Sequence, residues 1–335
     1  MNVSLVTVII PTIGRISYLK GAIDSVLNQS YKNIEIIISD NKSNISVRDA
    51  LSSYLDSRLR FVRREVRLDF ISHINLCIRE AEGTYLMILS DDDLISENFI
   101  ESMVNEFDAD PSVGIGLSPQ IILSTSDCEL KKINSNQRRL IDGWDFIEKY
   151  FLGGLEIPIY TFVSFFSRAD LIREFGGFSE FISGSDGSHS DNYLLIKIAQ
   201  KTNVVITEST FGYRVYPEST GLQTPITKLY QAGVIFEKNI NKILLLRFGF
   251  FSKKYLKLIF TIRRSLVFLC IDRLRRYYFG KITFKSYVMY FLYIFFRHPI
   301  LLTEFFLRRL TKFMLNKSMR LYSYLVRSAS LGERK

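Results

Sequence analysis

The chain has 335 residues, 47% of them hydrophobic and 23% charged, which is typical of a globular protein and excludes a disordered or fibrous one. Its cysteines, Cys77, Cys128 and Cys270, are odd in number and irregularly spaced, which excludes a disulfide framework or zinc-finger pattern and fits a reducing compartment. The net charge of +10 is uneven: residues 240–335 carry 21 basic and three acidic residues, a net +18, which leaves −8 on residues 1–239.

The first third of the chain alternates strand-like apolar runs with amphipathic helical stretches. Its first twelve residues resemble a strand and lack the features of a secretory signal, so none is expected. The alternation predicts parallel βαβ units in an open α/β sheet. The predicted strands are Leu5–Ile10, Ile34–Ser39, Leu59–Val62 and Tyr85–Leu89, and the predicted helices are Ser17–Asn28, Val47–Leu55, Ile71–Ala81 and Glu97–Phe107.

The middle of the chain has a mixed pattern, and the last third is helical. We predict strands over Ile115–Ser124 and Tyr160–Ser167, helices over Asp142–Phe151 and Ser190–Lys201, and a Gly- and Ser-rich mobile loop over Ile182–Ser190. From about residue 224 the sequence is aromatic, basic and helix-forming. Its longest uncharged stretch, Ser286–Phe296, is far shorter than the roughly 20 apolar residues of a membrane span, so no transmembrane helix is predicted. The expected division is an α/β domain over 1–223 and a helical region over 224–335.

Two acidic tracts follow predicted strands. Asp40–Asn41 ends one strand and Asp91, Asp92 and Asp93 follow another, where parallel strands release the chain into a ligand crevice. Three adjacent carboxylates repel one another unless a cation neutralises them. A hard divalent ion that bridges a phosphate-bearing ligand is the usual solution, so the sequence predicts a site for a metal and a nucleotide.

Several ordered motifs between residues 3 and 220 strongly resemble those of family 2 glycosyltransferases, which use the GT-A nucleotide-sugar fold. They are TVIIPTIGRISYLKGAIDSVLNQSYKNIEIIISDNKSN, REAEGTYLMILSDDDLISENFIE (the segment of the DxD metal motif), EFGGFSEF, SDNYLLIKIA and GYRVYPEST. The chain looks most like bacterial enzymes that build surface polysaccharides such as O-antigen or capsule. The resemblance implies an inverting hexosyl- or deoxyhexosyltransferase that uses Mg²⁺ or Mn²⁺.

The sequence departs from the family pattern at several positions. Asn41 and Ser90 stand where many members have Asp, and Tyr216 replaces a frequent His. The Gln-x-x-Arg-Trp motif of processive synthases is absent, which favours addition of one sugar per encounter.

The resemblance assigns donor-binding roles to residues at the strand ends. Asp40 is expected to accept a hydrogen bond from the nucleobase, although it could simply cap the following helix. Asp91 is expected to contact ribose and Asp92 to be the main metal ligand, with Asp93 as a second ligand or an orienting group. The remaining nucleotide-binding candidates are Pro11, Thr12, Arg15, Arg63 and Arg64, and the arginines could instead form a solvated basic edge.

The candidate general base is Asp191, which matches the family's acidic motif and could otherwise be a helix N-cap. Its rival is Asp186 in the preceding loop. In inverting transfer, such a carboxylate removes the proton of the acceptor hydroxyl as the oxygen attacks the anomeric carbon.

The basic tail suggests partners beyond the nucleoside-diphosphate sugar. Segments such as Leu301–Leu325 place aromatic and aliphatic side chains on one face with basic residues around it, which suits an anionic membrane surface. We expect a cytoplasmic enzyme, peripheral on the inner face of the cell membrane, that acts on a lipid-diphosphate-linked glycan. A helical bundle that packs on the catalytic domain or in a homo-oligomer is the alternative. A nucleotidyltransferase is a weaker hypothesis, because PTIGRIS is a poor match to a Gly-rich phosphate loop. A nucleic-acid-binding protein is also weaker, because the basic tail is rich in bulky apolar residues, so no nucleic acid partner is expected.

Overall fold

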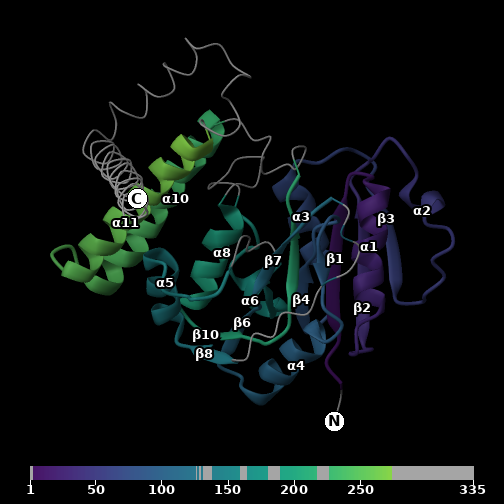
Figure 1. Cartoon of the computed structure of the whole chain (residues 1–335), viewed down its shortest axis with the longest axis horizontal. Helices are drawn as coiled ribbons and strands as arrows, with labels where there is room; N and C mark the ends of the chain where they lie inside the picture. Colours follow the sequence, from purple (N-terminus) through teal and green to yellow (C-terminus); the bar gives the residue numbers. More distant parts are fainter. Residues whose placement is uncertain are drawn as a thin grey trace, which may run out of the picture. The chain divides into compact units, whose positions relative to one another are not determined.

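The computed structural model describes residues 3–125, 127, 130, 138–158, 164–179, 189–216 and 226–273. The chain forms two compact units, Met1–Ile259 and Phe260–Lys335, and the fold below is that of the first. The domain boundary expected after residue 223 lies outside the described residues and stays a prediction. The expected α/β class is confirmed (Figure 1).

The main sheet has eight strands in the order β3-β2-β1-β4-β9-β6-β10-β8. The strands β1, β2, β3, β4, β6 and β10 run parallel, whereas β9 and β8 are antiparallel to their neighbours. Most positions of β1 and β2 are buried, as expected for central strands covered on both faces. The bounds are β1 Val6–Thr12, β2 Ile34–Asp40, β3 Leu59–Arg63, β4 Tyr85–Ile88, β6 Val113–Leu117, β8 Arg139–Ile141, β9 Phe166–Arg168 and β10 Asn203–Ile206.

Helices cover the sheet because each has an apolar stripe at helical spacing. On one face α1 and α4 bury residues such as Leu19, Ile23 and Met103 in the core cluster. On the other face α3 contacts β1 and α6, and α8 contacts β6 and α5. The helix bounds are α1 Ile16–Leu27, α2 Val47–Ala50, α3 Phe70–Glu80, α4 Phe99–Ala109, α5 Gly143–Leu152, α6 Ala169–Glu174 and α8 Ser190–Ala199.

Three predicted elements are wrong in extent. In its described part, residues 164–167, the strand expected over Tyr160–Ser167 begins only at Phe166, as β9. The helix expected over Val47–Leu55 ends at Ala50, since serines with low helix propensity follow and Leu55 is exposed. The single strand expected over Ile115–Ser124 is two strands in different sheets, β6 and β7 (Gln120–Leu123). Pro119 lies between them, and its ring and missing N–H end a strand. The expected Gly- and Ser-rich loop falls almost wholly on residues 180–188, outside the described part.

A second sheet of three strands, in the order β5-β11-β7, lies next to the acidic tract in sequence and in space. Its strand β5 spans Leu94–Ile95 and β11 spans Phe211–Arg214. After it the chain forms α10 (Ile226–Phe248) and α11 (Lys253–Arg273). None of the helices in the described ranges is long and apolar enough to cross a bilayer.

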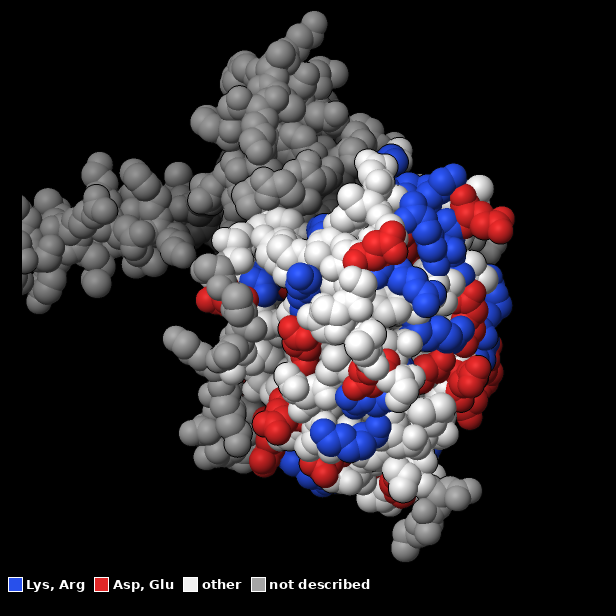
Figure 2. Space-filling view, turned by 90° about the vertical axis from the view of Figure 1, so that its right-hand side faces the viewer, with Lys and Arg blue, Asp and Glu red and all other residues white. Residues whose placement is uncertain are grey.

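The edge strand β3 is protected by charge. Arg60 pairs with Glu35 at 2.8 Å and Arg63 pairs with Asp40 at 3.1 Å, both on the neighbouring strand β2. Figure 2, which views this side of the molecule, shows acidic and basic side chains interspersed over the surface. Such charges discourage edge-to-edge pairing with another chain.

Candidate active site

The carboxyl ends of three neighbouring strands bring the predicted donor residues together. In the parallel register Pro11 pairs with Ser39 and Thr12 with Asp40, and the acidic tract follows β4. The Thr12 hydroxyl donates to Asp91 Oδ2 at 2.5 Å, which joins the end of β1 to the tract. Gly14 follows with φ +95°, and a Cβ there would lie 2.8 Å from the Ser43 Cβ, so only glycine lets the loops after β1 and β2 approach so closely.

The acidic tract is buried, and Arg15 neutralises part of its charge. The exposed fractions of Asp91, Asp92 and Asp93 are 0%, 8% and 2%. Burial raises the pKa of Asp91, which Arg15 opposes, and burial together with Asp92 raises the pKa of Asp93. The Arg15 guanidinium pairs with Asp91 and lies 3.0 Å from Asp92 Oδ2. Burial alone would lower the pKa of Arg15, but these two carboxylates raise it, so Arg15 is a permanent cation at the tract.

Two residues from the end of the α/β part complete the cluster. The Tyr216 hydroxyl donates to Asp92 Oδ2 at 2.7 Å and also contacts Arg15. The Arg214 backbone N–H donates to Asp93 Oδ1 at 2.9 Å, and its guanidinium donates to the Asp92 carbonyl at 2.8 Å. Of the two roles left open for Asp93, these contacts fit the orienting one. Both residues belong to the GYRVYPEST motif, in which the sequence suggests Arg214 as a phosphate contact but does not single out Tyr216 for the site.

Asp40 lies on the wall of a small cavity. Its Oδ1 accepts from the Ser43 backbone N–H at 2.8 Å, and its Oδ2 accepts from Arg63 at 3.1 Å. The cavity has a volume of about 240 Å³, and Phe61 and Arg48 also line it. Because a carboxylate has about four acceptor positions, Asp40 retains capacity for a further donor such as a ring N–H.

Arg64 points away from Asp40 into a buried polar cluster behind the sheet. Its guanidinium forms two 2.6 Å hydrogen bonds with Glu80 and donates to the Ser39 hydroxyl at 3.1 Å. His73 shares that hydroxyl at 2.7 Å; burial and then Arg64 lower its pKa to about 4, so the ring is neutral at pH 7. The structure therefore brings Arg63, but not Arg64, to the Asp40 carboxylate.

This cluster yields a stability prediction. Arg64 is 8% exposed and Glu80 27%, so Glu80→Gln leaves a mostly buried guanidinium without its counter-ion. We expect unfolding free energy to fall by about 2 kcal/mol, measured by chemical denaturation. The matched control is Glu174→Gln, whose pair with Lys201 is more than half exposed and should cost under about 0.5 kcal/mol. Equal costs for the two variants would contradict the structural role of the cluster.

Asp191 lies in the first turn of α8 and is half-buried. The Gly176–Gly177 turn, at φ +79° and +69°, is held on α3 by Asn75, which bonds both the N–H and the carbonyl of Phe178 at 2.8 Å. The Ser190 hydroxyl then ties this turn to the start of α8, accepting from the Ser179 N–H at 2.6 Å. Burial, followed by the charge of Asp191, raises the pKa of Tyr150 on α5. Asp186 lies outside the described residues.

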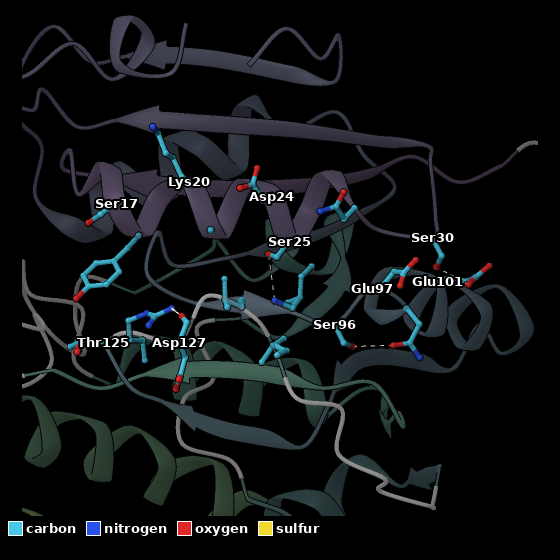
Figure 3. A pocket seen from close by; sticks show the side chains of 18 residues that line it. Ser17, Lys20, Asp24, Ser25, Ser30, Ser96, Glu97, Glu101, Thr125 and Asp127 are labelled. Atoms are coloured by element: carbon cyan, nitrogen blue, oxygen red, sulfur yellow. Dashed lines mark hydrogen bonds between the residues drawn. The ribbon is translucent and has the colours of Figure 1, made fainter. Parts of the chain in front are cut away.

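A second cavity, of about 1120 Å³, lies beside β5, the strand that follows the tract, and Arg214 forms part of its wall. Figure 3 shows its lining side chains, which come from α1, β5, the start of α4 and the segment near Thr125. Tyr18 forms part of its wall, with its ring 5.2 Å from that of Tyr216 and the Arg214 guanidinium 5.0 Å above it. Most of the residues that line this cavity are polar or charged.

The donor groups of the tract fit a hard divalent cation. Within the described ranges, no three His, Cys, Asp or Glu side chains are grouped to hold a metal by themselves. Mg²⁺ needs only one or two protein carboxylates when phosphate oxygens and water complete its coordination. Asp92 offers such a carboxylate, and the Arg15 guanidinium beside it shows that the site accommodates positive charge.

Comparison with known proteins agrees with this geometry. The sequence model described as "Glycosyl transferase family 2" matches residues 7–176. Glycosyltransferase GlyG of Streptococcus pneumoniae is 32% identical over 115 residues, 33% of this chain and 38% of that protein. An uncharacterized glycosyltransferase of Rickettsia typhi, RT0329, is 38% identical over 101 residues, 30% of this chain and 31% of that protein. The chain therefore matches only about a third of the length of these curated relatives.

Solved structures share the fold at low sequence identity. Staphylococcus aureus TarS 1-349 in complex with UDP-GlcNAc has a TM-score of 0.53 at 13% identity, covering 78% of this chain and 80% of that one. The mannosyltransferase PcManGT from Pyrobaculum calidifontis, in complex with GDP-Man and Mn²⁺, has a TM-score of 0.53 at 16% identity, covering 81% and 74%. These likenesses support the nucleotide-sugar-binding GT-A fold.

Proposed function

The chain belongs to glycosyl transferase family 2, and from this premise we propose that it transfers one sugar from a nucleoside-diphosphate sugar to a lipid-diphosphate-linked glycan, with inversion at the anomeric carbon. The observation that carries the proposal is the meeting of Thr12, Arg15, Asp91 and Asp92 at the carboxyl edge of the sheet. Open α/β sheets bind their ligands at this edge.

The donor half of the reaction uses the residues at the strand ends. The nucleobase occupies the cavity beside Asp40, where the carboxylate accepts a ring N–H and Phe61 supplies an apolar wall. Asp91 accepts from ribose hydroxyls, and Arg15 and Arg63 contact the diphosphate. The backbone of Pro11, at the end of β1 beside Ser39, is proposed to contact the ribose side of the nucleoside. UDP-GlcNAc and GDP-Man, the ligands of the similar structures, support a nucleoside-diphosphate sugar as the donor.

Asp92 is the proposed main ligand of Mg²⁺ or Mn²⁺, with Tyr216 and Arg214 holding it in place. When bound there, the ion supplies positive charge against the diphosphate oxygens. Asp93 orients the tract through β11. Arg15 moves from the carboxylates to the donor phosphates as the site fills.

The acceptor half centres on Asp191. Because α8 leads into β10, and β10 runs parallel to β6, the first turn of α8 belongs to the edge where the parallel strands end. There Asp191 accepts the proton of the acceptor hydroxyl while the oxygen bonds to the anomeric carbon and the nucleoside diphosphate leaves. We also propose a role in surface-polysaccharide synthesis, which such an acceptor class would serve. The basic region after residue 223 supports a peripheral position on the inner face of the membrane.

A thermal-shift screen tests the donor assignment. UDP, GDP, UDP-GlcNAc and GDP-Man are added separately to the full chain, with and without Mn²⁺. We expect one base series to raise the melting temperature, because a ligand at a hundredfold excess over its Kd stabilises by about 2.7 kcal/mol. Mn²⁺ should enlarge this shift, and Asp40→Ala should reduce it, while the control Asp24→Ala on α1 should not. A flat response to every nucleotide would overturn the proposal.

A further inference from the structure

The helices α10 and α11 follow one another as a hairpin (Figure 1), and the turn between them carries two exposed phenylalanines. Gly249 ends α10 in the left-handed conformation at φ +76°, and its N–H donates to the Leu245 carbonyl at 2.9 Å. Ser252 begins α11: its hydroxyl accepts from the N–H groups of Lys254 at 3.2 Å and Tyr255 at 3.4 Å. Phe250 and Phe251 fill the two positions between these caps.

Apolar exposure at this turn is high for a folded surface. Phe251 and the preceding Leu246 are each 89% exposed, and Phe250 is 57% exposed. The same hairpin buries Leu244 and Leu258 completely, so it already has an inner apolar face. The rings of Phe250 and Phe251 lie 5.2 Å apart and form an exposed apolar patch that this inner face does not require, and exposed apolar patches often mark a binding site.

Basic residues flank the tip along the chain. Lys242, Lys253 and Lys257 are exposed, and the sequence has no Asp or Glu between Glu237 and Asp272. Two further cations of the turn contact α5: Arg247 lies 5.1 Å from the centre of the Trp144 ring, and Lys254 pairs with Glu148. The exposed part of the turn thus combines aromatic side chains with net positive charge.

We propose that the tip of the α10–α11 hairpin, formed by Leu246, Phe250 and Phe251 with Lys253 and Lys257 beside it, inserts into the headgroup region of an anionic membrane. Aromatic rings favour the boundary between headgroups and acyl chains, and lysines can keep their ammonium groups at anionic headgroups. A turn of two exposed rings reaches only the outer part of the bilayer, consistent with an interfacial contact. The purpose of this contact rests on the proposed function, but the binding itself does not.

The hairpin also connects this surface to the candidate acceptor site. Phe248 at the end of α10 packs on Trp144 of α5, with ring centres 5.7 Å apart. Earlier in α10, the ring of Phe236 stacks on the ring of His189, with ring centres 5.2 Å apart. His189 lies two residues before Asp191. A membrane-bound tip would therefore fix the orientation of α8 relative to the surface that holds a lipid-linked acceptor.

Vesicle flotation of the full chain tests the contact. Phosphatidylcholine vesicles are compared with vesicles of equal parts phosphatidylcholine and phosphatidylglycerol. We expect Phe250→Ser with Phe251→Ser to lower partition to the anionic vesicles at least about tenfold, since two large apolar side chains are lost. Lys253→Glu with Lys257→Glu should lower it about twentyfold or more, and this part should weaken in high salt. The controls are Leu55→Ser, at a site 90% exposed, and Lys32→Glu, neither of which should change partition. Unchanged partition of the Phe250/Phe251 variant overturns the proposal.

A fluorescence measurement separates the tip from other membrane-binding parts of the chain. Trp144 is the only tryptophan, so Phe251→Trp in a Trp144→Phe background places a single reporter at the tip. We expect a blue shift on adding anionic vesicles. If the protein bound vesicles without a shift of the tryptophan emission, another segment would be responsible for attachment. If the emission were already blue-shifted without vesicles, the tip would be covered by protein. Either result overturns the proposal. The nucleotide-induced thermal shift should persist in every tip variant, so failure here is distinguishable from failure of the donor assignment.

Discussion

Replacement of Asp92 by asparagine is expected to lower metal-supported sugar transfer about a thousandfold. The amide has the shape of the carboxylate and can still accept from Tyr216 at the same oxygen position. It lacks the negative charge that a divalent ion requires, and loss of one well-placed electrostatic group at a developing charge costs about a hundred- to a thousandfold. Initial rates with the donor found in the nucleotide screen, measured over a range of Mn²⁺, give the result.

Two measurements distinguish loss of metal binding from loss of fold. The melting temperature without ligands should change little, because Arg15 keeps its second partner, Asp91. Mn²⁺ titration in the presence of the nucleotide should show weaker binding to Asp92→Asn but not to Asp110→Asn, a carboxylate at the far end of α4. Wild-type transfer that continues in excess chelator would contradict the role given to Asp92.

Asp191→Asn is expected to retain donor binding but lose turnover by about 10²- to 10⁴-fold, the usual contribution of a general base. His189 occupies the N-cap position and Asp191 lies inside the first turn, so the substitution removes the base and costs the helix only a charge–dipole interaction of about 0.3–1 kcal/mol. The matched comparison is Asp186→Asn in the same protein. Unchanged nucleotide-induced stabilisation together with a low rate would support the assignment.

The two aspartates give opposite outcomes under the competing assignments. If Asp186→Asn alone lost turnover, the base would be Asp186 and Asp191 would be a helix-terminal residue. If neither variant lost turnover, the acceptor would be deprotonated elsewhere. Donor hydrolysis in the absence of acceptor provides a control, since it needs the donor site but not the acceptor hydroxyl.

The contacts of Arg15 explain how three adjacent carboxylates can be buried together. Three buried carboxylates would repel one another strongly, yet Asp91 and Asp92 share one guanidinium and Asp93 accepts a backbone N–H from Arg214. This arrangement compensates the charge within the protein. Donor phosphates offer Arg15 an alternative partner, so nucleotide binding and release of Asp92 should occur together.

The sequence determined the parts of the fold that depend on local pattern. Alternating apolar runs are enough to identify β1, β2, β3 and β4 with their helices, because burial on both faces and helical spacing act within a few residues. The same pattern placed Asp40 and Asp91–Asp93 at strand ends. The short strands β5 and β8 carry too little pattern for this, and Pro119 divided a run that apolarity alone would join.

Only the tertiary structure decided which side chains meet. Arg63 and Arg64 are adjacent in sequence, but successive residues at a strand end point to opposite sides, so Arg63 reaches Asp40 and Arg64 reaches Glu80 behind the sheet. Tyr216 and Arg214 contact the acidic tract although more than a hundred residues of sequence separate them from it. They do so because β11 pairs with β5, the strand that directly follows the tract. Such contacts are set by strand pairing between distant segments, and the spacing of residues along one chain does not encode them.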